Sequence, residues 1–86
     1  MNAEVVEKAL DFNYEVRREI EGMTFERKNE LEFHSAKVRI LELKCDTIAR
    51  QSGCSTGDDN VQAYRIYEKT LIFLNGAFTI LEKLSL

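Results

Sequence analysis

Apolar residues recur every three or four positions along three stretches of this chain, and a polar turn separates the second stretch from the third. Such spacing keeps apolar side chains on one face of an α-helix. The pattern predicts helices over residues 3–21, 25–51 and 59–84 and no strands. Because the chain contains no proline, these helices can run long. We expect a single all-α domain of the coiled-coil type.

The third predicted helix carries two apolar seams at heptad spacing, although packing against one helix needs only one. The first seam comprises Tyr64, Tyr67, Leu71, Leu74, Phe78 and Leu81. The second comprises Ile66, Phe73, Ala77, Ile80 and Leu84. Together they form an apolar arc wider than one partner helix covers. We therefore expect the surplus face to bind another helix, and this is the main indication of function.

The second predicted helix repeats the double pattern. One stripe comprises Leu31, His34, Val38, Leu41, Cys45 and Ile48, and the adjacent stripe comprises Phe33, Ala36, Ile40 and Leu43. Two long helices of similar length joined by a short polar turn pack best as an antiparallel hairpin. The pattern leaves open which seam of each helix lies inside the hairpin. The additional N-terminal helix can fold back as a third member, stay loose or engage another chain.

Glycines mark the expected helix ends, with one exception. Gly22 suits the left-handed position just beyond the first helix, and Thr24 can cap the next one, although a single glycine can also be absorbed into one long kinked helix. Gly76 instead falls inside the third helix, where glycine costs about 1 kcal/mol relative to alanine. Close approach of a partner backbone over Gly76 and Ala77 would compensate for this cost, and so would packing against the chain's own first helix.

Length and charge argue against several functional classes. A chain of 86 residues cannot bury a large core by itself, so a partner or an oligomer would help to stabilise it. A net charge of -3 without a basic cluster argues against binding to nucleic acid or to anionic membranes. No stretch approaches the ~18 apolar residues of a membrane span, and the N-terminus lacks the pattern of a secretion signal. We expect a cytoplasmic protein without membrane insertion.

Residues that could carry chemistry do not form a recognisable constellation. His34 and Cys45 fall on an apolar stripe, so we expect a core or seam histidine and a buried thiol. Cys54 lies in the polar turn and is expected to be a free thiol. Glu15 and Glu19 share a helix face but lack the Glu-x-x-His companions of a di-metal site. We expect no enzymatic activity, no metal site and no cofactor.

The third predicted helix resembles the C-terminal helix of the small E-type co-chaperones for needle subunits of bacterial type III secretion systems. The resemblance is carried by residues 62–67 (QAYRIY) and 74–84 (LNGAFTILEKL) and covers roughly the last 55 residues. It implies a helical hairpin that binds a larger tetratricopeptide-like chaperone and keeps the needle subunit soluble before export. Shorter members of that family lack a clear counterpart of residues 1–22.

On this interpretation the partner-binding residues lie on both seams of the third helix. They are Tyr64, Ile66, Tyr67, Phe73, Leu74, Gly76, Ala77, Ile80, Leu81 and Leu84. Two alternatives stay open. An acidic inhibitor of the phage or immunity type would present Glu15, Glu19, Glu26 and Glu30 to a basic target. A homodimeric coiled-coil adaptor would satisfy the second seam with its own copy.

Overall fold

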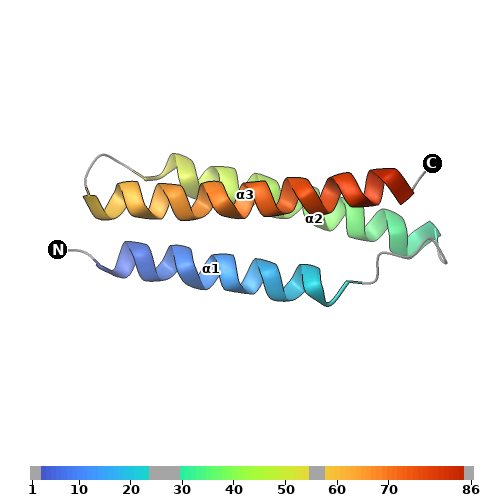
Figure 1. Ribbon diagram of the computed structural model, residues 1–86, viewed down its shortest axis with the longest axis horizontal. Helices are drawn as coiled ribbons and strands as arrows, with labels where there is room; N and C mark the ends of the chain where they lie inside the picture. Colours follow the sequence, from blue (N-terminus) through green and yellow to red (C-terminus); the bar gives the residue numbers. More distant parts are fainter. Residues whose placement is uncertain (1–2, 24–29, 55–57, 85–86) are drawn as a thin grey trace.

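The computed structural model describes residues 3–23, 30–54 and 58–84, and these form three α-helices and no strand. The helices are α1 (Ala3–Glu21), α2 (Glu30–Ser52) and α3 (Asp58–Leu84). They lie side by side in an elongated bundle of 49 × 18 × 15 Å. As Figure 1 shows, α1 and α3 run in the same direction and α2 runs antiparallel to both. The expected all-α fold, with α2 and α3 as an antiparallel hairpin, is confirmed.

The helix ends agree closely with the pattern in the sequence, but the end of α1 is built differently. The expected start of the second helix at residue 25, and Thr24, lie outside the described residues. The backbone N–H of Gly22 donates to the carbonyl of Arg18 at 3.1 Å, and that of Met23 donates to Ile20 at 3.0 Å. The φ angle of Gly22 is not in the left-handed region. The expected left-handed cap is therefore wrong, because a tight turn closed by Met23 ends α1 instead.

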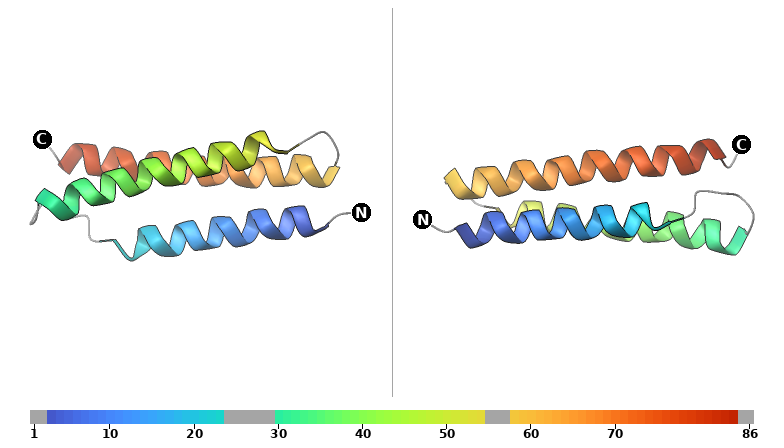
Figure 2. Two further views of the ribbon diagram at one scale, coloured as in Figure 1. Left: turned by 180° about the vertical axis from the view of Figure 1, so that it is seen from behind. Right: turned by 60° about the horizontal axis from the view of Figure 1, so that its bottom comes forward.

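The central helix of the bundle is α3, which packs against both other helices (Figure 2). Its buried positions alternate three and four residues apart, and they are Ala63, Tyr67, Thr70, Leu74, Ala77 and Leu81. This line runs between the two predicted seams. One flank faces α1, where the guanidinium of Arg17 lies 4.7 Å from the ring centroid of Phe73. The other faces α2, where the ammonium of Lys44 lies 5.7 Å from the ring centroid of Phe78. Two helices therefore share the wide apolar arc of α3.

Helix α1 folds back onto α3 as a third member of the bundle. Its buried stripe consists of Ala9, Phe12, Val16 and Ile20. The ring of Phe12 meets Tyr67 edge-on, with centroids 5.9 Å apart. Beside them, the Asn13 side-chain amide donates to Thr70 Oγ1 at 2.7 Å, and the Thr70 hydroxyl donates to the Ile66 carbonyl at 2.9 Å. This polar pair fixes the register of α1 on α3, because any slip would leave partly buried polar groups without partners.

Helix α2 packs with the stripe that contains Phe33, Ile40 and Leu43, so its other apolar stripe faces solvent. Cys45 is consequently exposed, and the expectation of a buried thiol is wrong. His34 is exposed as well and takes no part in the core. The physical reason is that both stripes satisfy heptad spacing, whereas α3 can cover only one of them. The stripe that α3 covers contains Phe33 and continues into the buried residues Thr47 and Gln51.

Candidate partner-binding surface

The ten residues expected to bind a partner divide into two groups. Four are buried in the core of the chain itself, and these are Tyr67, Leu74, Ala77 and Leu81. The other six are half-buried or exposed, and these are Tyr64, Ile66, Phe73, Gly76, Ile80 and Leu84. While the bundle stays closed, a partner can reach the second group far more readily than the first. The structure therefore restricts the expected surface to part of α3.

Helix α1 already covers much of the second seam of α3. Asn13 lies opposite Thr70 and Arg17 lies opposite Phe73, so α1 ends level with the segment just after Ala77. The last turns of α3, which carry Ile80 and Leu84, extend roughly 9 Å beyond that point at 1.5 Å per residue. Among the described residues, α1 thus covers the first half of the seam, and no helix covers the part near the C-terminal end of α3.

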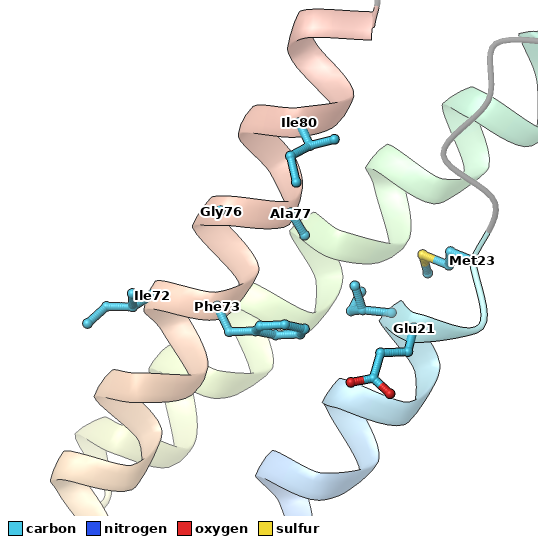
Figure 3. Close-up of a pocket in the computed structure, with 8 residues that line it drawn as sticks. Glu21, Met23, Ile72, Phe73, Gly76, Ala77 and Ile80 are labelled. Carbon is cyan, nitrogen blue, oxygen red and sulfur yellow. The ribbon is translucent and has the colours of Figure 1, made fainter.

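An open apolar groove of about 480 Å³ lies where α1 ends beside α3. The residues that line it are Ile20, Glu21, Met23, Ile72, Phe73, Gly76, Ala77 and Ile80. Figure 3 shows Phe73 pointing from α3 toward α1, with Met23 bordering the opposite side and Ile72 pointing away. Glu21 is the single charged residue among these eight. The groove therefore offers apolar surface to a partner, with one carboxylate at its rim.

Gly76 leaves a stretch of bare helix backbone at this groove. A Cβ atom added to Gly76 would meet nothing within 4 Å among its described surroundings. The alternative that this glycine packs closely against the chain's own first helix is therefore wrong. Ala77 makes that contact instead, since it is buried beside α1 while Gly76 is exposed. The space over Gly76 is open to the backbone of another molecule.

One charged side chain, that of Arg17, packs on Phe73 next to the groove. The guanidinium of Arg17 covers the Phe73 ring, and its Nε donates to Asn13 Oδ1 at 3.1 Å. Asn13 in turn donates to Thr70. A cation held in this way over an aromatic face is stabilised by the ring quadrupole. This contact helps to hold the Phe73 ring against α1.

The acidic face of α1 is partly neutralised within the molecule. Both carboxylate oxygens of Glu19 accept hydrogen bonds from Arg39 on α2, one of them at 2.9 Å from Nη2. These hydrogen bonds lower the pKa of Glu19 and raise that of Arg39. Glu15 and Glu30 are exposed, and Glu26 lies outside the described residues. An inhibitor that used this face would therefore have one carboxylate fewer than the sequence indicates.

Residues that could hold a metal do not gather anywhere in the described parts of the chain. Within them, no three His, Cys, Asp or Glu side chains lie close enough together to bind an ion. Both cysteines are free thiols, and Cys54 Sγ lies 3.6 Å from the Arg50 carbonyl, to which it donates. Across the same ranges, no helix combines the length and the apolarity needed to cross a bilayer.

Sequence reasoning missed the α1 side of the groove, namely Ile20, Glu21 and Met23. A usable signal was present, because the first predicted helix is shorter than the third and cannot cover it from end to end once the two run in the same direction. The bare position at Gly76 falls close to this end of the third helix.

Comparison with protein-family models, with curated proteins and with solved structures finds no match to this chain.

Proposed function

We propose that this chain is a non-enzymatic helical binding protein, of the chaperone or co-chaperone kind, that holds an apolar helix of a partner against the groove at Gly76. The observation that carries the proposal is an apolar groove with bare helix backbone on one side. An exposed glycine in the interior of a 27-residue helix costs helix stability. Close approach of a partner backbone is a benefit that offsets this cost.

The shape of the groove suits a helix as the bound element. Its α3 wall presents Phe73, Ala77 and Ile80 at spacings of four and three residues, parallel to the helix axis. A helix laid into such a groove inserts apolar anchors at the same spacings. The small residues Gly76 and Ala77 allow the two backbones to come close. Glu21 at the rim favours a partner with a basic residue beside its apolar stripe.

The finer form of the proposal follows from the resemblance carried by residues 62–67 and 74–84. On this reading the partner is a larger tetratricopeptide-like chaperone, and the complex keeps a type III secretion needle subunit soluble in the cytoplasm before export. Gly76, Ala77 and Ile80 belong to the resembling segment and line the groove. Because Ile66 and Phe73 are partly buried against the core of the chain itself, we place the docking surface nearer the C-terminal end of α3 than the sequence pattern does.

The test is a capture experiment with two matched variants on α3. Ile80 is 50% exposed and lines the groove, whereas Val61 is 43% exposed and does not. Tagged wild type, Ile80→Asp and Val61→Asp are expressed in the cells that make the protein, and bound proteins are identified by mass spectrometry. We expect a helical partner with wild type and Val61→Asp and its loss with Ile80→Asp. Equal capture by all three, or no specific partner, would refute the proposal.

The identity of the captured protein then decides the finer form. A tetratricopeptide-like chaperone together with a small needle-like helical protein supports the secretion role. A different helical partner that still depends on Ile80 supports the binding function and eliminates the secretion role. Circular dichroism of the two variants shows whether both remain folded, as their exposed positions lead us to expect.

A further inference from the structure

The outward-facing stripe of α2 forms a second apolar surface, separate from the groove. It comprises Leu31, His34, Val38, Leu41, Cys45 and Ile48, all of them exposed. The four aliphatic members are between 44% and 75% exposed. Their positions alternate three and four residues apart, which is the heptad spacing of a coiled-coil seam, and they extend over roughly 25 Å. We call this surface the outer seam.

We propose that the outer seam pairs with the same seam of a second copy, so that two α2 helices form a parallel two-stranded coiled coil. The inference is independent of the proposed function, because no residue of α2 lines the groove at Gly76. A seam of this regularity buries its apolar residues most completely against another seam of the same spacing. The helices in the described part of the chain do not supply one, since α3 packs on the other stripe of α2.

Charges beside the seam favour a second copy in parallel orientation. Lys37 directly precedes Val38, and Glu42 directly follows Leu41, so these two charges lie on opposite edges of the seam. In a parallel pair, a residue on one edge meets the residue five positions later on the other helix. Lys37 therefore meets Glu42 of the second copy, and symmetry repeats this pair. Opposite charges at these positions stabilise the pairing and select its orientation.

The antiparallel alternative places like charges together. If the full seam is used with Val38 opposite Leu41 of the second copy, Lys37 comes to lie opposite Lys44, and symmetry repeats this contact as well. Lys37 and Lys44 lie on the same edge of α2, and within the single chain their ammonium groups are turned toward α3, 5.8 Å and 5.7 Å from the ring centroid of Phe78. Like charges at such positions are destabilising. The charge pattern thus discriminates between the two orientations.

The residues inside the seam agree with a parallel pair. Leu31, Val38 and Cys45 occupy one heptad position of the seam, and His34, Leu41 and Ile48 occupy the other. The central pair, Val38 followed by Leu41, is a β-branched residue followed by leucine, which is the arrangement that favours two parallel strands. Each side chain then faces its own counterpart. The two Cys45 thiols would therefore face each other across the seam, at a separation that a disulfide can bridge.

The first test uses Cys45 as a reporter of orientation. In a Cys54→Ser background, Cys45 is the sole cysteine, and the chain is treated with copper phenanthroline as oxidant after its mass is measured by sedimentation equilibrium. We expect a dimer that becomes covalently linked through Cys45. In the antiparallel arrangement the two Cys45 residues would lie roughly 16 Å apart along the helix axis and could not be bridged. A monomer at high concentration, or a dimer that does not crosslink, would overturn the proposal.

The second test uses charge exchange and does not depend on the thiol. We expect Lys37→Glu or Glu42→Lys alone to raise the dissociation constant of the dimer about tenfold, because each change turns two attractive pairs into two repulsive ones. The double exchange should restore most of the affinity. Single variants that dimerise like wild type, or a double exchange no better than the singles, would contradict the parallel register. Ile80→Asp should leave the dimer intact, which separates this test from that of the groove.

Discussion

Replacing Gly76 by alanine tests whether the groove exists as a binding surface or is only a gap in the packing. Gly76 lies in the interior of α3, is exposed, and has nothing within 4 Å of the place where a Cβ would stand. Alanine is favoured over glycine there by about 0.8–1.0 kcal/mol from helix propensity, and no clash offsets this gain. We therefore expect the free energy of unfolding to rise by about 0.5–1 kcal/mol. In a domain of this size, that raises the melting temperature by about 2–8 °C.

The same substitution should weaken partner binding. Its methyl group stands where the partner backbone is proposed to approach, so affinity for the captured partner should fall while stability rises. Thermal and urea unfolding followed by circular dichroism measure the first effect, and titration calorimetry measures the second. Thr79→Ala is the matched control, because it raises helix propensity on the same helix at an exposed residue outside the groove.

Two results would refute the reasoning about Gly76. If Gly76→Ala destabilises the protein, the space over the glycine is filled in the folded chain, and the groove is not open. If it stabilises the protein without affecting partner affinity, the partner does not approach the backbone there. If both Gly76→Ala and Thr79→Ala lower the affinity for the partner, the cause is the greater rigidity of α3, because both variants raise helix propensity and only Gly76→Ala alters the groove.

Three further predictions concern the bundle itself. Thr70→Val removes the hydroxyl that accepts a hydrogen bond from Asn13 on α1, and urea unfolding should show that the free energy of unfolding falls by about 1–3 kcal/mol. The control Thr79→Val, at an exposed position, should lower it by at most about 0.5 kcal/mol. Equal losses in the two variants would contradict a register held by this hydrogen bond. Leu74 is fully buried in the core, and Leu74→Ala should lower the free energy of unfolding by about 2–5 kcal/mol. A decrease below about 1 kcal/mol would show that the core is not closed around this residue. The lowered pKa of Glu19 beside Arg39 stabilises the fold above the ordinary carboxyl pKa, and this stability is lost as pH falls through the lowered value. Because the pair is partly exposed, the effect should be below about 1 kcal/mol, should weaken in high salt and should vanish in Glu19→Gln; a pH profile unchanged by that variant would refute it.

Periodicity alone predicted the helices and the hairpin, because spacing reports directly on which residues share a helix face. It did not predict which face is inside. Both stripes of α2 satisfy the heptad rule, and the buried line of α3 includes Thr70, a polar residue that a count of apolar positions omits. Thr70 can be buried because its hydroxyl donates to the Ile66 carbonyl and accepts from Asn13 on α1. This is a tertiary arrangement that neither segment reveals by itself.

The candidate site was predicted in part for a similar reason. Gly76 and Ile80 were among the residues expected on the binding surface, and both line the groove, whereas their binding to a partner stays a prediction. Tyr67 and Leu74 belonged to the same pattern but lie in the core, since a wide apolar arc can be shared by two helices of one chain as well as by a partner. The contribution of Met23 depends on where α1 ends relative to α3, and that register is set by side-chain contacts distant in sequence.

The two apolar surfaces of this chain differ in a way that assigns them different roles. The groove is short, contains bare backbone at Gly76 and is lined by α1 and α3, whereas the outer seam is long, regular and confined to α2. Pairing through α2 leaves both grooves of a dimer uncovered, since α2 lines neither of them. Such a dimer would hold two partner helices at once, and a partner with two apolar helices would bind more tightly than either helix alone because the second contact is intramolecular. The combination therefore predicts that Leu41→Asp, which should break the dimer, weakens binding to a two-helix partner while leaving the affinity for a single helix unchanged.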